Sequence, residues 1–464
     1  MRTASDPAGP LTSSFRDPSG HVFVRDGRVL RQVNRSYAMQ FERLLSSGLY
    51  DALAAAGLLI PHRELPLESA TDVYRVLEPE RIPFISYPFE WAFAQLKAAA
   101  LTTLDVQKRA VDHGMVLKDA SAYNIQFRGA APVLIDTLSF DIWEEGTPWA
   151  AYRQFCQHFL GPLALMSRAD VRLGALSRVF IDGVPLDLVA DLLPFSSKLA
   201  PSLLVHVHLH ARAQRRHASG TVDRQARRSF TRTAMLGLVE HLERAVQALT
   251  YGARGTAWVE YYDQTNYTAA AMAEKERLVE AFVKRAQPAT VWDLGANTGM
   301  FSRIASAAGA YTVACDGDPA AVERHYLDCR TRHEPRVLPL VVDLANPSGP
   351  MGWNHEERQS LLDRGPADLV MALGLVHHLS LTNQVPFDMV AEFFRRAGRA
   401  LIVEFVPRAD SQVAAMLARM PALGPRYTQE AFEQAFATRF ETIDTALIAG
   451  SERRLYLMQA KGRS

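Results

Sequence analysis

The spacing of apolar positions changes character about halfway along the chain. In the second half, short apolar runs alternate with stretches whose apolar residues recur at helical spacing, at 269–286, 300–308 and 428–437. The runs predict strands that end near residues 293, 316, 343, 373, 405, 448 and 459. Alternating strands and helices predict an α/β domain over residues 251–464, built on one seven-stranded sheet.

The first half follows a mixed pattern. Residues 1–20 are rich in Pro, Ser and Gly and are expected to form a flexible arm, and the alternation around Asp26–Gly27 predicts a β-hairpin. The pattern is helical at 36–59, extended at 74–87, and helical again at 91–114 and 149–250. This order predicts an α+β, largely helical domain over residues 21–250, with a boundary near 245–258.

A glycine turn follows the first strand of the second half. The stretch Val291-Trp-Asp-Leu-Gly-Ala-Asn-Thr-Gly-Met-Phe301 has the order strand, tight turn and helix start. Gly295 and Gly299 lack a Cβ, so the backbone there can adopt unusual angles and approach a ligand closely. With the acidic Asp293 before it and Asn297 within it, the turn is typical of a nucleotide site in an α/β fold, and these residues are candidates for cofactor binding.

Later strands of the second half also end in residues suited to a nucleotide-like ligand. Asp316 ends the second strand, where a carboxylate can accept hydrogen bonds from ribose hydroxyls. The third strand leads into Asp343 and Leu344, where a polar group can meet the amine of adenine. The fourth ends at Leu373. Strand ends of this kind meet at one edge of a parallel sheet, so the sequence predicts a single site there.

Residues 258–461 resemble class I S-adenosylmethionine-dependent methyltransferases. The glycine turn, Asp316, Asp343 and the Val-His-His-Leu after the fourth strand carry the resemblance. More narrowly, several segments are similar to the NoeA-type nodulation-related methyltransferases: Asp343-Leu-Ala-Asn-Pro-Ser, Gly352-Trp353, Glu357-Arg358, Leu375-Val-His-His-Leu and Ile402-Val-Glu-Phe-Val-Pro. The resemblance implies a Rossmann-like fold, S-adenosylmethionine as cofactor, and a small-molecule, natural-product or glycan acceptor.

Three residues are candidates for the acceptor side of such a site. His377 and His378 follow the fourth strand, and a neutral imidazole there could take an acceptor proton or orient a nucleophile. The alternative is that both histidines only shape the pocket. Glu404, at the end of the fifth strand, is a further candidate for acceptor contact. Adjacent histidines cannot easily share one metal ion, and no metal is expected here.

A nicotinamide-dependent dehydrogenase is the main alternative for the second half, because an acid after the second strand suits that cofactor too. Its turn would have the spacing Gly-x-Gly-x-x-Gly, whereas this chain has Asn297 at the second position and lacks the third glycine spacing. The expected strand pair at the C-terminus also favours the methyltransferase.

A second motif lies in the first half. Asp119, Asn124 and Asp136, the last closing an apolar strand, resemble the catalytic-loop Asp, its Asn and the metal-binding Asp of kinase-like phosphotransferases. The resemblance implies Mg²⁺ and ATP at a kinase-like N-terminal domain, although no glycine-rich loop or strand lysine precedes the motif. The alternatives are turn-forming residues in a fold without this activity, and a module that binds a partner or presents the acceptor.

Two clusters outside these motifs have competing interpretations. His206, His208 and His210 could bind a metal on a strand, but no acid or cysteine stands at ligand spacing, so helix packing is favoured. Residues 212–232 are rich in arginine without interleaved aromatic residues, which favours a solvated face over an RNA site.

Composition narrows the class of protein further. The chain is 48% hydrophobic and 22% charged with a net charge of +1, which does not favour a nucleic-acid partner. Its three cysteines are scattered, which favours a reducing cytoplasm over a disulfide framework. The N-terminus lacks the apolar core of a signal peptide, and no apolar run reaches membrane-spanning length, so no membrane partner is expected. The sequence carries no signal for an oligomeric state.

Overall fold

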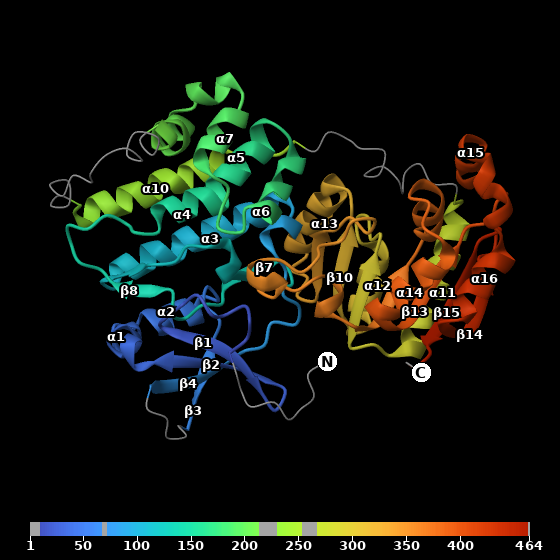
Figure 1. Cartoon of the computed structure of the whole chain (residues 1–464), viewed down its shortest axis with the longest axis horizontal. Coiled ribbons are helices and arrows are strands. Elements are labelled where there is room, and N and C mark those ends of the chain that lie inside the picture. The colour runs from blue at the N-terminus through green and yellow to red at the C-terminus, as the bar shows by residue number, and fades with distance from the viewer. Residues whose placement is uncertain (1–9, 67–71, 213–229, 253–266, 463–464) are drawn as a thin grey trace. The chain divides into compact units, whose positions relative to one another are not determined.

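The computed structural model describes residues 10–66, 72–212, 230–252 and 267–462. By its internal contacts the chain divides into two units (Figure 1). The first comprises residues 1–252 together with 351–358, and the second comprises residues 253–350 and 359–464.

The second unit is built on a seven-stranded sheet in the order β11-β10-β9-β12-β13-β15-β14. The strands are β9 (Thr290–Leu294), β10 (Tyr311–Asp316), β11 (Val337–Val341), β12 (Ala367–Ala372), β13 (Gly398–Phe405), β14 (Phe440–Leu447) and β15 (Arg454–Ala460). Neighbours pair in parallel except β15, which is antiparallel to both β13 and β14. All seven strands predicted from the sequence are therefore confirmed, and they form one sheet.

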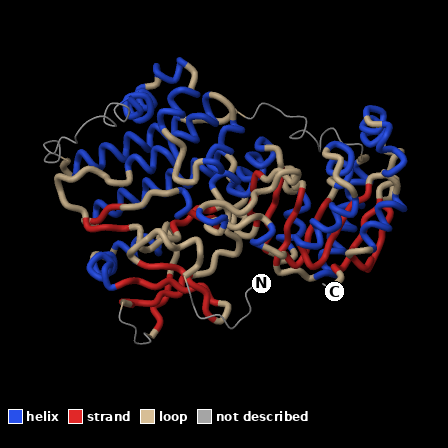
Figure 2. The backbone as a smooth tube through the Cα atoms, viewed as in Figure 1, coloured by secondary structure: helices blue, strands red, loops and turns tan. Residues whose placement is uncertain are grey.

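Helices flank this sheet (Figure 2). They are α11 (Ala269–Ala286), α12 (Met300–Ala307), α13 (Pro319–Thr331), α14 (Phe387–Ala397), α15 (Ser411–Arg419) and α16 (Gln429–Ala437). One buried cluster joins α11 and α12 to the strands, with Val279, Phe301 and Ile402 among its members. A second, aromatic group joins α14 and α16, where the ring centroids of Phe387 and Phe432 lie 5.8 Å apart. Burial of the apolar surface of these two groups stabilises the unit.

The first unit separates a strand-rich part from a helical part (Figures 1 and 2). Its sheet has the antiparallel order β1-β2-β4-β3, formed by β1 (Gly20–Arg25), β2 (Arg28–Asn34), β3 (His62–Leu65) and β4 (Val73–Pro79), with α1 (Ala38–Ser46) and α2 (Leu49–Ala55) between β2 and β3. The predicted hairpin is confirmed. Asp26 and Gly27 both have positive φ, 51° and 72°, as a two-residue turn of this hand requires.

The helical part centres on α3 (Phe93–Asp112), which packs against α10 (Arg232–Ala248). Two short ladders adjoin it, β5 (Met115–Leu117) with β8 (Phe140–Ile142), and β6 (Ile125–Arg128) with β7 (Ala131–Leu134). Among the described residues this part also contains the helices α4 (Tyr152–Phe155), α5 (Gly161–Arg168), α6 (Leu176–Val179), α7 (Leu186–Leu192) and α8 (Pro201–Leu203), with π-helical turns η4 (Cys156–Leu160) and η7 (Leu204–Leu209). Among described residues, no helix is both long and apolar enough to cross a bilayer.

Residues 351–358 follow β11 and precede β12 in the sequence, yet they belong to the first unit. Within this segment, Glu357 is 2% exposed and accepts hydrogen bonds from Nε and Nη2 of Arg16, over 2.6 and 2.9 Å. Arg358 places its guanidinium carbon 4.3 Å from the ring centroid of Tyr123. Residues 10–19, expected to belong to a flexible arm, run beside β1, where the N–H of Leu11 donates to the carbonyl of Val22.

Arg16→Gln should lower the free energy of unfolding by about 1–2 kcal/mol, a range reduced because Arg16 itself is half exposed. The variant weakens a charged pair while the Glu357 carboxylate stays buried. Urea denaturation of the full chain measures the change. Arg172→Gln, which removes the exposed ion pair with Asp170 in the same unit, is the matched control and should leave stability unchanged. Equal changes in the two variants would contradict the prediction.

Candidate functional site

The glycine turn joins β9 to α12 and lies against the end of β10. The N–H groups of Gly295 and Ala296 both donate to the carbonyl of Cys315, over 2.8 and 3.0 Å. Gly295, Asn297 and Gly299 all have positive φ, at 78°, 49° and 82°. The alternating left-handed positions turn the chain sharply from strand into helix, and glycine adopts them without strain.

Gly299 leaves no room for a side chain. A Cβ at this position would lie 2.0 Å from Nε2 of His325, a buried residue of α13. Burial lowers the pKa of His325 to about 3, so this imidazole is neutral at physiological pH. The requirement for glycine predicted from the sequence therefore has a second cause, which is close approach of α13 to the turn.

If the turn holds S-adenosylmethionine as the resemblance implies, Gly299→Ala should weaken binding of this methyl donor at least tenfold and lower the melting temperature, because the turn or α13 must shift. Calorimetry with S-adenosylmethionine and a thermal melt measure the two effects. Gly349→Ala is the control, since no atom lies within 4 Å of a Cβ built there and its φ is not positive. A Gly299→Ala variant with wild-type affinity would show that the turn tolerates the shift.

Asp316 ends β10 and faces the glycine turn. Its Oδ2 accepts a hydrogen bond from the N–H of Asn297 over 2.8 Å, and its Oδ1 accepts from the N–H of Asp318 over 2.9 Å. Burial raises the pKa of Asp316, and these backbone donors oppose that rise. The next strand end lies close by, since a Cβ built on Gly317 would be 3.9 Å from the Cα of Asp343. The structure therefore brings the turn, Asp316 and Asp343 together.

The remaining residues predicted for the donor differ in exposure. Asp343 is exposed and its Oδ1 accepts from the N–H of Ala345 over 2.9 Å, while Leu344 is half-buried and Leu373 is 9% exposed. Asp293 is 2% exposed and its Oδ2 accepts from Oγ of Ser302 over 2.6 Å. Burial raises the pKa of Asp293 to about 7. Asp293 thus lies beneath the turn, fixed to α12, rather than at its surface.

His377 and His378 stack against each other directly after β12, with ring centroids 4.1 Å apart. His377 is fully buried, and neither of its ring nitrogens has a hydrogen-bond partner among the described residues. Burial, and then the charge of Arg453, lowers the pKa of His378 to about 4, and burial, followed by His378, holds the pKa of His377 well below its usual value. Both imidazoles are neutral at pH 7, which is the state required of a proton acceptor.

Glu404 is the centre of a buried charged network. Its Oε2 accepts from Nζ of Lys275 over 2.6 Å, and its Oε1 accepts from the hydroxyl of Tyr267 and from Nη1 of Arg453, the latter over 3.4 Å. Arg453 also donates to Asp410 from Nε and Nη2, over 2.9 and 2.7 Å. Burial alone would raise the pKa of Glu404, but Lys275 and Arg453 lower it.

Sequence reasoning missed the partners of Glu404. Lys275 lies on α11 and Arg453 in the turn before β15, far from Glu404 along the chain. Tyr267 lies just before α11, and residues 258–266 before it lie outside the described residues. The only signal in the sequence was that Lys275 interrupts the apolar face of α11. Hydrophobic periodicity alone does not show whether such a lysine is buried or exposed to solvent.

The kinase-like motif of the first unit is also brought together. Asp119 accepts hydrogen bonds from the N–H of Ser121 and from the side chain of Asn124. Burial, and to a lesser extent the charge of Asp136, raises the pKa of Asp119. Asp136 lies 2.5 Å from Nη2 of Arg31 on β2. The sequence shows no lysine on a strand before this motif. The structure instead places the cation of Arg31, a residue of β2, at Asp136, and the hydrophobic periodicity of the sequence did not indicate this.

A second cation lies beside this motif. Nζ of Lys118 donates to Oγ of Ser19 over 2.6 Å and lies 3.7 Å from the carboxylate of Asp17. Asp17 is also 3.8 Å from Arg31. Two cations therefore lie near the carboxylate of Asp17, whose Oδ1 also accepts from the N–H of Ser19 over 2.8 Å. Among the described residues, no group of three or more His, Cys, Asp and Glu is arranged to hold a metal ion.

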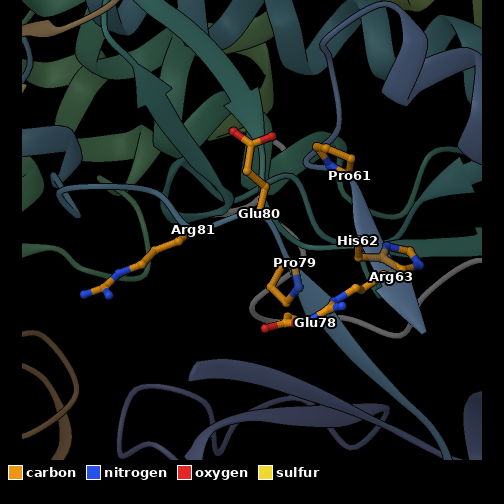
Figure 3. Close-up of a pocket in the computed structure, with 7 residues that line it drawn as sticks. All are labelled: Pro61, His62, Arg63, Glu78, Pro79, Glu80 and Arg81. Carbon is orange, nitrogen blue, oxygen red and sulfur yellow. The ribbon is translucent and has the colours of Figure 1, made fainter. Parts of the chain in front are cut away.

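A surface cavity of about 430 Å³ lies elsewhere in the first unit, between β3 and β4 (Figure 3). Its lining consists of Pro61, His62, Arg63, Glu78, Pro79, Glu80 and Arg81. Glu78 pairs there with Arg63 and with Arg28, while Arg81 points away from the other labelled side chains (Figure 3). No residue predicted for catalysis or cofactor binding lines this cavity.

The three alternating histidines pack on helices, as favoured from the sequence. His206 lies in the π-helical turn η7, where Nδ1 is 2.7 Å from the hydroxyl of Tyr152 and Nε2 is 2.6 Å from Nδ1 of His241. His208 is 2.9 Å from Oγ of Ser197, and His210 stacks on Tyr152. Most of the arginine-rich stretch lies outside the described residues, although Arg232 pairs with Asp112 at the start of α10.

The fold and the strand ends of the second unit together define a class of enzyme. A seven-stranded sheet in which only β15 runs against the others, with a glycine turn facing an acidic strand end, is the arrangement of S-adenosylmethionine-dependent methyltransferases. The chain belongs to the NoeA family of nodulation proteins: it is 35% identical over 460 residues to nodulation protein NoeA of Rhizobium meliloti (strain 1021), covering 97% of this chain and 96% of that protein. The methyltransferase class and the NoeA-type resemblance inferred from the sequence are confirmed.

Comparison with solved structures gives similar proteins over less than half of this chain. Magnesium protoporphyrin IX methyltransferase (ChlM) of Synechocystis PCC 6803 has a TM-score of 0.32 and 16% identity, covering 44% of this chain and 92% of that chain. N-methyltransferase NodS of Bradyrhizobium japonicum WM9, solved with S-adenosyl-L-homocysteine, has a TM-score of 0.33 and 12% identity, covering 45% and 94%. The bifunctional kinase-methyltransferase WbdD has a TM-score of 0.31 and 14% identity, covering 45% and 43%. No protein-family model matches the chain.

Proposed function

We propose that the second unit transfers the methyl group of S-adenosylmethionine to a small polar molecule or a glycan. The observation that carries the proposal is the position of Asp316, whose Oδ2 accepts from the N–H of Asn297 in the glycine turn and whose Oδ1 accepts from the N–H of Asp318. A carboxylate fixed in this way suits the two ribose hydroxyls of the donor. The turn fits the donor as well, because Gly295 and Gly299 adopt positive φ angles that let the backbone approach a ligand closely.

In this proposal each strand end has one part of the donor to hold. The backbone of Gly295, Asn297 and Gly299 meets the methionine portion, and Asp293 holds the turn through Ser302 of α12. Asp316 binds the ribose. The residues proposed for the adenine end and the wall beside it are Asp343, Leu344 and Leu373. S-adenosylmethionine supplies an electrophilic methyl group on a sulfonium, so alignment of donor and acceptor provides much of the rate.

His377 and His378 are the proposed acceptor-side groups, together with Glu404. The unpartnered nitrogens of His377 favour it as the residue that orients or takes an acceptor proton, because a buried polar atom without a partner is costly unless a ligand satisfies it. Glu404, with both oxygens occupied by protein donors, supports orientation of the acceptor more than proton abstraction. The net charge of +1 favours neither DNA nor RNA as acceptor.

The experiment that tests this function has two parts. Calorimetry with S-adenosylmethionine on the purified full chain should give saturable binding. Mass spectrometry of cell extract incubated with the protein and methyl-labelled donor should then detect a polar product that gains a methyl group. Absence of donor binding would contradict the proposed function, and a labelled protein or nucleic acid as sole product would contradict the proposed acceptor class.

As a second function, we propose that the first unit binds a phosphate-bearing ligand such as magnesium–ATP beside Asp119, Asn124 and Asp136. The contact of Asp119 with Asn124, and the cations Arg31 and Lys118 nearby, support this proposal. Binding of ATP measured by calorimetry should depend on Mg²⁺ and be lost in Asp136→Ala, with methyl transfer intact. Failure of wild-type protein to bind ATP with Mg²⁺ would leave partner binding or acceptor presentation as the role of this unit.

A further inference from the structure

Lys275 carries a buried ammonium group between the donor turn and the end of β13. Its side chain is 5% exposed, and Nζ donates to Oε2 of Glu404 over 2.6 Å. The same nitrogen lies 4.8 Å from the ring centroid of Phe301 and 4.9 Å from that of Tyr267. Phe301 is the second residue of α12 and comes two residues after Gly299. One side chain therefore touches both the helix start at the donor turn and the strand end proposed for the acceptor.

Tyr267 extends the same cluster. Its ring lies 4.5 Å from the guanidinium carbon of Arg453 and 4.9 Å from Nζ of Lys275, and its hydroxyl donates to Oε1 of Glu404. A ring held by two cations is a geometry in which cation–π attraction adds to hydrogen bonding, most strongly away from water. Movement of Glu404 would thus disturb Tyr267, Lys275 and Arg453 together.

Stability alone gives a weak reason for such a network. Two charges taken out of water lose hydration free energy that their mutual attraction repays only in part, and apolar replacements of buried pairs are often neutral or stabilising. What a buried pair provides is a fixed geometry. In this unit the pair fixes the start of α12, directly after the glycine turn, and the end of β13, which follows His377 in the sequence.

We propose that Lys275 is a positioning residue for methyl transfer, which couples the donor turn to the acceptor-facing end of β13 through Phe301 and Glu404. The inference rests on the proposed function, because it assumes that the turn binds S-adenosylmethionine. It assigns Lys275 no contact with the reacting atoms. When the donor orders the turn and α12, the Lys275 side chain passes that order on to Glu404 and the residues after it.

Hydrogen exchange followed by mass spectrometry tests this coupling on the full chain with and without S-adenosylmethionine. In wild-type protein the donor should slow exchange at least about threefold both in residues 295–303 and in residues 404–411. In Lys275→Met the protection of 295–303 should remain and that of 404–411 should be lost. Lys284→Met, which removes an exposed ion pair with Glu280 on the same helix, should behave like wild type.

A second variant allows the inference to be tested even if Lys275→Met does not fold. Lys275→Met combined with Glu404→Gln removes both charges of the pair, which avoids a buried unpaired carboxylate. This double variant should bind the donor and lack protection in 404–411. Equal protection of 404–411 in wild type and variants, or no protection there in wild type, would overturn the inference. A wild-type protein that binds no donor would instead overturn the proposed function.

Discussion

Replacement of Asp316 by alanine should weaken binding of S-adenosylmethionine about a hundredfold, or ~2.7 kcal/mol. Two effects add. The variant removes a carboxylate expected to accept from two ribose hydroxyls, and hydrogen bonds to a charged group contribute about 1.5–3 kcal/mol each. It also removes the acceptor that holds the N–H of Asn297 over 2.8 Å, so the turn loses part of its preorganisation. Calorimetric titration of the full chain measures the change.

Two further variants separate these effects. Asp316→Asn removes the charge and one acceptor oxygen, but it keeps the side-chain volume and the other acceptor oxygen. We therefore expect a smaller loss of affinity than in Asp316→Ala, about tenfold. Asp444→Ala removes an exposed carboxylate of β14 that pairs with Arg285, and it should bind donor as wild type does. Unchanged affinity in Asp316→Ala would exclude the ribose assignment, while a loss shared by Asp444→Ala would indicate general damage to the unit.

The strands of the second unit were predictable because each is a short apolar run that ends in polar residues or glycine. A short, continuous apolar run of this kind is typical of a strand in a parallel sheet that is buried on both faces. The glycine turn was recognisable for a related reason, since residues at positive φ are restricted to few residue types. The structure confirms the seven strands, and the positive φ of Asn297 adds a position that the glycine pattern does not include.

Contacts between residues distant along the chain were not predictable in the same way. Lys275 and Glu404 are 129 positions apart, and nothing in the local pattern around either residue names the other. The segment 351–358 presents the same difficulty, because its position between two strands of the second unit predicts a loop of that unit. Its buried Glu357 instead pairs with Arg16 of the first unit. Periodicity reports which face of an element is buried, but it does not report the partner.

His377→Ala should lower the rate of methyl transfer by about 10²–10⁴-fold while donor affinity stays within about threefold of wild type. His377 is fully buried after β12 with two unpartnered ring nitrogens, so truncation removes the group proposed to orient or take the acceptor proton. His378→Ala, at the second proposed acceptor-side residue, gives the comparison between the two histidines. It removes the stacked neighbour, half-buried and 4.1 Å away between ring centroids, and should cost less. Initial rates come from labelled-donor incorporation at saturating donor.

The pH dependence of the rate gives an independent check on His377. A histidine of ordinary pKa, near 6.5, would lose its neutral form as the pH falls from 8 to 6. Burial, followed by the charges of His378, Arg453 and Lys275, holds the pKa of His377 well below that value. His377 therefore stays neutral between pH 8 and pH 6, and its titration should cause no change in the wild-type rate over this range. A rate that falls with a midpoint near 6.5, or an unchanged rate in His377→Ala, would place proton removal on another group.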